Sequence, residues 1–289
     1  MSMAETVLVT GAGGFVGRCV ARVLRERGMR VVAHARRAGP GIDLVADLAD
    51  ASAWPLPSGI VAVVHCAAAI PSRSDAFARD NAAATAQLAN LLSRVATLRR
   101  VVHLSSISTY RRPPEGRWII SEDAPTVAAD DTHDYAASKR AAELAFDALA
   151  RQRPELGVTH VRASSIYGPG MIRSTLLPVL VTRALGGEAL ILRGARNYRQ
   201  NFVHVSDVAE LAATLAVETA AWPVVNAFSD DSLDLFALAE LVRTGLGSSS
   251  VVMDNTHDAA GPEPVFVNAV AKRLHPMFRS LSDNLRDAA

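Results

Sequence analysis

Short runs of apolar residues alternate along the chain with stretches in which apolar residues recur every three or four positions. The runs predict strands at 7–10, 30–34, 60–66, 100–105, 157–162 and 224–228. The three- or four-residue spacing predicts helices, most clearly over 81–96, 137–151 and 206–217. Uninterrupted runs such as 60–64 are typical of strands buried on both faces. The alternation therefore predicts an α/β fold, with a parallel sheet between two layers of helices.

Two regions depart from this alternation. The segment 111–134 carries three prolines and many charges, and we expect a long loop there. The stretch 171–197 and the C-terminal part of the chain follow a helical or irregular pattern. We therefore expect a main domain of residues 1–170, to which 198–230 returns, and a smaller C-terminal substrate lobe made of 171–197 and 231–289.

A glycine-rich turn follows the first strand directly. Gly11, Gly13, Gly14 and Gly17 stand between the strand and a helix whose apolar stripe begins at Val16. Glycines at such a turn let backbone N–H groups approach a pyrophosphate, and the helix directs its positive end at that charge. This context predicts a dinucleotide site in a Rossmann-type doubly wound parallel sheet.

Tyr135 and Lys139 lie four residues apart in a predicted helix, and hence on one helical face. A free phenol has a pKa of about 10, and a nearby ammonium lowers it by favouring the phenolate. Ser106, at the end of a predicted strand, can donate a hydrogen bond to a substrate oxygen. Downstream of a dinucleotide turn, this set predicts proton transfer coupled to hydride transfer. An exposed tyrosine beside a solvated lysine is the alternative interpretation.

Composition narrows the class of protein. Of 289 residues, 49% are hydrophobic and 20% charged, and the net charge is +1. We therefore expect a small-molecule substrate and no nucleic-acid partner. The apolar runs are shorter than a membrane span, and the first strand begins too early to leave room for a signal peptide, so we expect no membrane association. The two cysteines, Cys19 and Cys66, indicate reduced thiols in a cytoplasmic protein. We expect no metal site.

The whole chain resembles the extended short-chain dehydrogenase/reductases, the nicotinamide-dependent epimerase/dehydratase group that mostly handles nucleotide sugars. Residues 10–17 resemble that family's TGxxGxxG turn, 65–68 its H-x-A-A strand end, and 135–139 its YxxxK motif. Further segments match in order: Asp47-Leu48, 104–110, 166–170, 201–209 and 271–274.

The resemblance implies roles for individual residues. It makes Ser106, rather than Ser105 or Ser108, the catalytic hydroxyl, together with Tyr135 and Lys139. It implies a cofactor site formed by Gly11, Gly14, Phe15, Val16, Gly17, Arg36, Asp47, Leu48, Ala67, Ala68, Tyr135 and Lys139. It also implies a homodimer in which helices near 81–96 and 137–151 form a four-helix interface. Ordinary packing of these alanine-rich helices on the sheet is the alternative.

The end of the second strand bears on the choice of cofactor. An NAD site usually places a carboxylate there, which accepts from the ribose hydroxyls. This chain has none before Asp43, and Asp47 matches the adenine position instead. Arg36 and Arg37 can pair with a 2′-phosphate, Arg36 in particular. We therefore favour NADP over NAD, with a solvated basic turn as the alternative.

The substrate is less well defined by the sequence. Nucleotide-sugar members usually carry an arginine where this chain has Gln200, and Arg199 would face the other way on a strand. Arg173, Arg193 and Arg196 can compensate by binding a diphosphate, or they are surface charges. We expect a reductase of a keto sugar that is nucleotide-linked, as the family resemblance implies. The alternatives are an epimerase that recycles its cofactor, a reductase of a small ketone, and a non-catalytic nucleotide-sensing module. Ile107-Ser108 stands where dehydratases carry an Asp-Glu pair, which argues against dehydration.

Overall fold

The computed structural model describes residues 5–50, 54, 56–195, 198–220, 222–257 and 261–289. Packing divides the chain into two compact units: 1–111, 125–162 and 209–225 form the first, and 112–124, 163–208 and 226–289 the second. These units differ from the expected domain ranges, because 112–124, 163–170, 198–208 and 226–230 pack within the second unit. Each unit has its own hydrophobic core.

A seven-stranded sheet organises the first unit, in the order β11-β7-β5-β4-β1-β2-β3. Its strands are β1 (Thr6–Thr10), β2 (Arg30–Ala35), β3 (Leu44–Val45), β4 (Ile60–His65), β5 (Arg100–Ser106), β7 (Gly157–Ala163) and β11 (Val224–Ala227). The pairs from β5 to β3 are parallel. From β1 the chain runs outward to β2 and β3, then returns to the other side of β1 as β4. The doubly wound α/β fold predicted from the sequence is confirmed.

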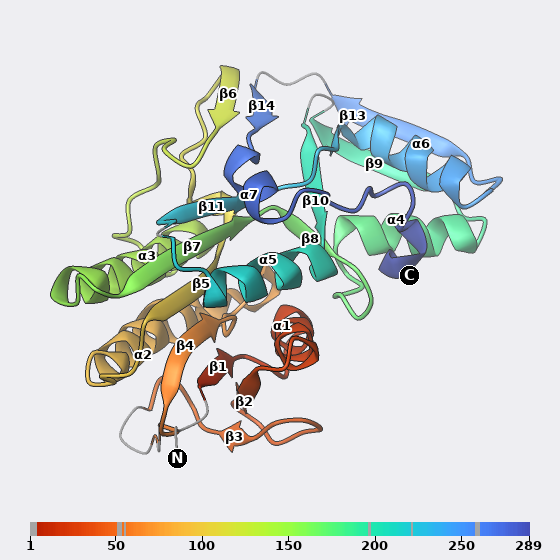
Figure 1. Cartoon of the computed structure of the whole chain (residues 1–289). Coiled ribbons are helices and arrows are strands. Elements are labelled where there is room, and N and C mark those ends of the chain that lie inside the picture. The colour runs from red at the N-terminus through yellow and green to blue at the C-terminus, as the bar shows by residue number, and fades with distance from the viewer. Residues whose placement is uncertain (1–4, 51–53, 55, 196–197, 221, 258–260) are drawn as a thin grey trace. The chain divides into compact units, whose positions relative to one another are not determined.

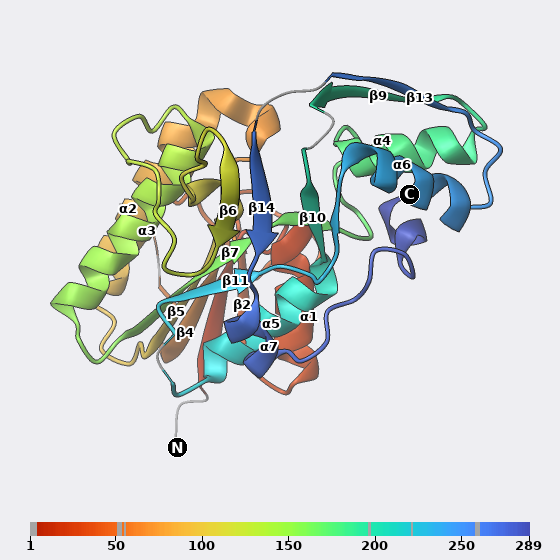
Figure 2. The same cartoon turned by 90° about the horizontal axis from the view of Figure 1, so that it is seen from above.

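Helices cover both faces of this sheet (Figure 1). They are α1 (Phe15–Glu26), α2 (Ala84–Leu92), α3 (Tyr135–Gln152) and α5 (Val205–Val217). Figure 2 shows α2 and α3 on one face and α1 and α5 on the other. The apolar stripe of α1 is buried at Val20, Val23 and Leu24, as its spacing predicted. The start of α3 is fixed by Asp134, whose carboxylate accepts from the backbone N–H of Ala137 at 2.9 Å.

Two expectations about local structure needed correction. The helix expected at 81–96 is confirmed as α2, but α2 ends at Leu92 and is preceded by a π-helical turn, Phe77–Ala83. The loop expected at 111–134 contains β6 (Gly116–Ile120), which pairs in parallel with β14 (Pro262–Phe266). A strand whose partner lies about 150 residues away along the sequence leaves little local signal, because that partner supplies its hydrogen bonds.

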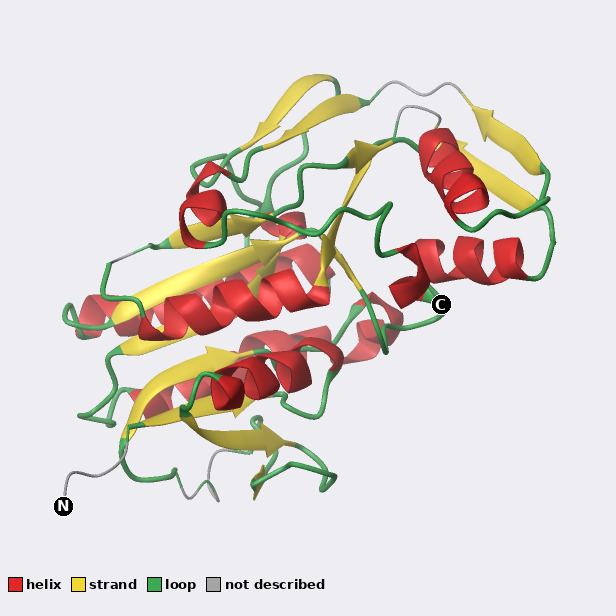
Figure 3. Cartoon of the chain, turned by 45° about the vertical axis from the view of Figure 1, so that its right-hand side comes forward, coloured by secondary structure: helices red, strands yellow, loops and turns green. Residues whose placement is uncertain are grey.

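The second unit holds smaller sheets. One consists of β12 (Ser232–Leu233), β10 (Gln200–His204) and β8 (Ser165–Tyr167), and another pairs β9 (Leu190–Ala195) with β13 (Val252–His257). Figure 3 shows this second pair beside α4 (Leu176–Leu185) and α6 (Leu235–Gly245). The unit also contains α7 (Ala269–Leu274) and a short 3₁₀ turn, Leu285–Ala288. Two further 3₁₀ turns, Pro71–Ala76 and Ile107–Thr109, belong to the first unit. Within the described part of the chain, no helix combines the length and the apolar character that crossing a membrane requires.

Candidate active site

The loops that follow β1 and β4 meet where the strand order reverses. Gly11 has a φ of 68°, a conformation that residues with a Cβ rarely adopt. A Cβ atom at Gly11 would lie 2.6 Å from the backbone nitrogen of Ala67. Only glycine therefore lets the two loops approach this closely. In open α/β sheets this switch point, at the carboxyl ends of the strands, is where ligands bind.

The rest of the turn is equally crowded. A Cβ at Gly17 would collide with the carbonyl oxygen of Gly11, and one at Gly14 would lie 3.1 Å from the same oxygen. Gly14 caps α1, and its N–H donates to Gly11 O at 2.9 Å. The turn thus brings the helix N-terminus close to the strand end, which is the geometry that phosphate binding requires.

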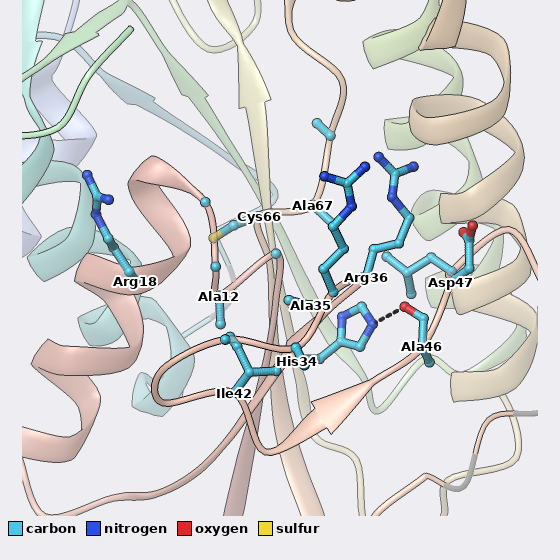
Figure 4. A pocket seen from close by; sticks show the side chains of 18 of the residues that line it. Ala12, Arg18, His34, Ala35, Arg36, Ile42, Ala46, Asp47, Cys66 and Ala67 are labelled. Carbon is cyan, nitrogen blue, oxygen red and sulfur yellow. Dashed lines mark hydrogen bonds between the residues drawn. The ribbon is translucent and has the colours of Figure 1, made fainter.

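A cavity of about 690 Å³ opens beside this turn (Figure 4). Seven of the residues expected at the cofactor line it, namely Gly11, Gly14, Arg36, Asp47, Leu48, Ala67 and Ala68. The other five, Phe15, Val16, Gly17, Tyr135 and Lys139, are not among its lining residues. The first three of those five lie in the first turn of α1.

Several lining residues were missed by the sequence reasoning. They are Arg18, His34, Cys66 and Asp80. Arg37, to which the basic run after β2 pointed, also lines the cavity, whereas Asp80 comes from a distant π-helical turn and had no local signal.

An ion-pair network crosses the side of the cavity formed by the end of β2. Arg36 contacts Asp80 at 3.0 Å, and Arg79 contacts both Asp80 and Asp47. A hydrogen bond from Arg79 lowers the pKa of Asp47. The end of β2 itself carries Ala35 and no carboxylate. Both cavity carboxylates are therefore already paired with arginines.

His34 supplies a buried polar atom at the same end of the cavity. Its Nε2–H donates to the carbonyl oxygen of Ala46 at 2.9 Å, the bond drawn in Figure 4. Its Nδ1 atom is buried and has no hydrogen-bond partner among the described residues. Burial lowers the pKa of His34, so the ring is neutral and Nδ1 is an acceptor. The glycine cradle, the arginines and this acceptor together fit an adenine dinucleotide.

The three residues expected to be catalytic come together in the first unit. Tyr135 begins α3, and its hydroxyl shares a hydrogen bond with Ser106 at the end of β5. Ser108 also donates to the Ser106 hydroxyl oxygen, at 2.9 Å. Lys139, one turn along α3, donates to the carbonyl oxygen of Leu104 at 2.6 Å. Ser105, by contrast, is buried and donates to Glu143 at 2.6 Å.

The surroundings shift the pKa values of both titratable groups. Burial raises the pKa of Tyr135, although the hydrogen bond with Ser106 opposes this effect, so the phenol is protonated at neutral pH. Burial also lowers the pKa of Lys139 to about 8. Such a site can donate a proton from the phenol to a developing alkoxide.

Asn81 fixes the loop after β4 relative to α3. Its Oδ1 accepts from the N–H of Ala69 at 2.7 Å, and its Nδ2 donates to the Ser138 hydroxyl at 3.0 Å. Ser138 in turn donates to the carbonyl oxygen of Tyr135 at 2.8 Å. The cofactor-side loop and the first turn of α3 are thereby tied together.

The arginines considered for a diphosphate belong to the second unit. Arg173 and Arg193 are exposed, and Arg196 lies outside the described residues. Arg199 is bound to the carbonyl oxygen and the hydroxyl of Ser232. Gln200 begins β10 and is half-buried.

Comparisons with known proteins agree with this geometry. The model of the NAD dependent epimerase/dehydratase family matches residues 7–227. A dTDP-4-dehydro-6-deoxy-D-allose reductase of Streptomyces sp is 30% identical over 280 residues, covering 84% of this chain and 82% of the relative. A 2-alkyl-3-oxoalkanoate reductase of Stenotrophomonas maltophilia (strain K279a) is 28% identical over 287 residues, covering 94% of this chain and 84% of the relative.

Among solved structures, MoeE5 in complex with UDP-glucose and NAD superposes with a TM-score of 0.79 at 25% identity. This match covers 99% of this chain and 97% of that one. The family match spans the glycine turn, the strand order and the Ser-Tyr-Lys set described above. The chain therefore belongs to the NAD dependent epimerase/dehydratase family and is an NAD(P)-dependent enzyme of the extended short-chain dehydrogenase/reductase type.

Proposed function

We propose that the protein is an NADPH-dependent reductase of a keto group on a nucleotide-linked sugar. The observation that supports it best is that Tyr135 lies beside Ser106 and one helical turn before Lys139, with a pKa that burial raises, so that the phenol keeps its proton at neutral pH. Reduction of a ketone requires an acid at the carbonyl oxygen, and a protonated phenol is such an acid. The similarity to a reductase of a dTDP-linked keto sugar supports the substrate class.

In the proposed mechanism, Ser106 donates a hydrogen bond to the substrate carbonyl oxygen and holds it beside Tyr135. The Tyr135 phenol then gives its proton to that oxygen as negative charge develops there. Lys139 stabilises the phenolate that remains, because its ammonium group favours the charged form. The reduced nicotinamide, when bound, supplies the hydride. Gly11 and Gly14 would hold its pyrophosphate, and His34 and Arg36 would lie at its adenosine half.

The test is a turnover assay with purified protein. NADPH is incubated with a panel of dTDP- and UDP-linked 4-keto sugars and simple 3-oxo acids, and NAD⁺ or NADP⁺ with the corresponding nucleotide sugars. We expect stoichiometric NADPH consumption with a keto sugar. Interconversion of sugar epimers without net consumption would instead identify an epimerase, and nucleotide binding without turnover of any substrate would favour a sensing module.

A reductase of a small non-sugar ketone is the second candidate. Gln200 stands where nucleotide-sugar enzymes of this family usually carry an arginine, and Arg199 is engaged by Ser232. The 2-alkyl-3-oxoalkanoate reductase aligns with 94% of this chain. Faster turnover of 3-oxo acids than of keto sugars in the same panel would establish this candidate and overturn the first.

We propose that Arg36 confers the preference for NADPH. It lies at the cavity beyond Ala35, at a strand end without a carboxylate that would repel a 2′-phosphate. Asp80, the present partner of Arg36, is also paired with Arg79. A 2′-phosphate can therefore replace Asp80 as the partner of the Arg36 guanidinium. A charge-assisted hydrogen bond contributes about 1.5–3 kcal/mol.

Arg36→Ala should therefore weaken NADPH binding by about 10- to 150-fold and change NADH binding little. Titration calorimetry at fixed ionic strength measures both, because exposed charge pairs weaken with salt. Arg22→Ala is the matched control, since Arg22 is an exposed arginine of α1 paired with Glu26. Equal losses for the two cofactors, or a wild-type protein that prefers NADH, would refute the assignment.

We also propose a homodimer formed through α2 and α3, as the family resemblance implies. Ala86 on α2 and Leu144 on α3 are exposed, Leu144 by 39%. Leu144→Glu should then give a monomer in sedimentation equilibrium, whereas a wild-type monomer would exclude the dimer.

We further propose that residues 1–170 together with 198–230 bind the cofactor, and that residues 171–197 together with 231–289 bind the substrate. The free thiols of Cys19 and Cys66 support a cytoplasmic location.

A further inference from the structure

A row of buried polar side chains extends from Lys139 through the first unit. Lys139 Nζ lies 3.5 Å from His103 Nε2 on β5. The other ring nitrogen of His103, Nδ1, lies 3.2 Å from Nδ1 of His160 on β7. His160 Nε2 lies 3.0 Å from Oδ1 of Asp147 on α3. His103 and His160 are buried, whereas the Asp147 side chain is 36% exposed.

The chemistry of the two ends fixes the direction of every hydrogen bond in this row. An ammonium can only donate, an ionised carboxylate can only accept, and a neutral imidazole donates from one nitrogen and accepts at the other. Lys139 therefore donates to His103 Nε2, His103 Nδ1–H donates to His160 Nδ1, and His160 Nε2–H donates to Asp147. With both rings neutral, this is the one arrangement in which all three contacts are hydrogen bonds.

We propose that His103, His160 and Asp147 are positioning residues that keep Lys139 in its ammonium form by fixing the tautomers of the two imidazoles. In the opposite tautomers, His103 would present an N–H to the lysine and its Nε2 could no longer accept. The carboxylate of Asp147 is the group that selects the favourable tautomers, although it lies two rings away from Lys139. The role of this device in catalysis rests on the function proposed above, whereas its hydrogen-bond geometry does not.

The protonation states of Lys139, His103 and Asp147 explain why this row of hydrogen bonds matters. Burial lowers the pKa of Lys139 to about 8, so the ammonium is close to losing its proton at physiological pH. Burial also lowers the pKa of His103 well below its usual value, which keeps that ring neutral. Asp147 stays ionised because, although burial raises its pKa, the hydrogen bond from His160 and the charge of Arg140 lower it.

Other titratable groups face this row from each neighbouring element, and their effects are constant between the variants used below. Glu143 favours the Lys139 ammonium and burial opposes it, while the Cys66 thiol, whose pKa burial raises to about 12, is uncharged between pH 7 and 10. The remaining groups are His65 on β4, Tyr135 and Arg140 on α3, and Arg162 on β7, which is paired with Glu143.

The sequence offers a direct measurement. The chain contains two lysines, Lys139 and Lys272. Protein labelled with ¹³C at the lysine side chains therefore gives two sets of signals, and Lys272, which belongs to the second unit, provides the reference. The Lys139 signal is titrated in the apo protein from pH 7 to 10, and ¹⁵N shifts of His103 and His160 report their tautomers at pH 8.

We expect the wild type to show hydrogen on Nδ1 of His103 and on Nε2 of His160. Asp147→Asn keeps the shape of the side chain but can donate as well as accept, so the tautomers should become mixed and the Lys139 midpoint should fall by about one pH unit. Asp147→Glu should restore both. His160→Gln should also lower the midpoint although it retains the Asp147 charge. Glu155→Gln, a carboxylate-to-amide change at an exposed residue paired with Arg153, is the matched control and should change neither.

The alkaline limb of the activity profile should move in parallel. At pH 8.5, Asp147→Asn should lose about eightfold in activity relative to wild type, and at pH 7 only about twofold. A lower Lys139 midpoint with unchanged tautomers would reduce the effect to loss of one charge and overturn the proposal, as would an unchanged midpoint. The Lys139 titration and the tautomer measurements use the apo protein, so their outcome does not depend on the identity of the substrate.

Discussion

At the scale of single residues, adjacent positions on one strand have opposite tasks. Ser105 points into the first unit and donates to the buried Glu143, whereas Ser106 shares a hydrogen bond with Tyr135. This division follows from the alternation of side chains along β5. Glu143 is also bound by Arg162 in a buried ion pair, which holds the part of α3 that carries Lys139 against β7.

Tyr135→Phe removes one hydroxyl and leaves the ring contact with Phe77, whose centroid lies 5.3 Å away. We expect the fold and cofactor affinity to survive and kcat to fall by about 10²–10⁴-fold, the loss associated with a positioned acid. Steady-state kinetics and calorimetry measure the two effects. Tyr198→Phe, at an exposed tyrosine of the second unit, should retain wild-type rates. If Tyr135→Phe keeps normal turnover, the phenol is not the acid.

At the scale of elements, the glycine turn connects β1 and α1 and has two separable functions. Gly17 lies against the Gly11 carbonyl and allows α1 to start beside the strand. Gly13 lines the cavity, and a Cβ there would meet only Ala35 Cβ at 3.4 Å and the side chain of Ile42 beyond it. One glycine therefore serves packing, and the other keeps the cavity open.

Gly17→Ala should accordingly destabilise the protein by about 1–3 kcal/mol, the usual result of overpacking. The melting temperature, measured by circular dichroism, should fall by several degrees. Gly13→Ala, the control with the same change of volume, should melt close to wild type and weaken dinucleotide binding. Equal melting temperatures for both variants would show that the turn accommodates a Cβ at position 17 without loss of stability.

At the scale of the whole molecule, buried histidines make stability depend on pH. Burial lowers the pKa of His65 to about 3 and that of His103 well below 6.5. Once unfolded, both rings bind protons below about pH 6.5. The stability that they contribute is therefore complete above about pH 6.5 and is lost as the pH falls towards the folded-state pKa, by about 1.4 kcal/mol per pH unit for each ring.

Urea denaturation at pH 7.5, 6.5 and 5.5 should consequently show a steep loss of stability over the lower interval and little over the upper one. His65→Gln should reduce the slope, while His133→Gln, at an exposed histidine, should retain it. A stability curve that is flat down to pH 5.5 would contradict the neutral, buried state of these rings.

The sequence by itself determined the features that depend on neighbouring residues. Period and run length located β1, β2, β4, β5, β7 and β11, because a strand buried on both faces must be apolar throughout. The glycine spacing located the turn, because a positive φ and a close backbone approach exclude side chains. The four-residue interval located Tyr135 and Lys139 on one face of α3.

The tertiary structure alone decided what depends on distant partners. β6 exists because β14 pairs with it, and the π-helical turn brings Asp80 to Arg36 across the cavity. The row from Lys139 to Asp147 joins α3, β5 and β7. Nothing in the sequence around either histidine distinguishes it from an ordinary strand residue. A hydrogen bond between strands depends on their order in the sheet, and that order is set by the packing of the whole first unit.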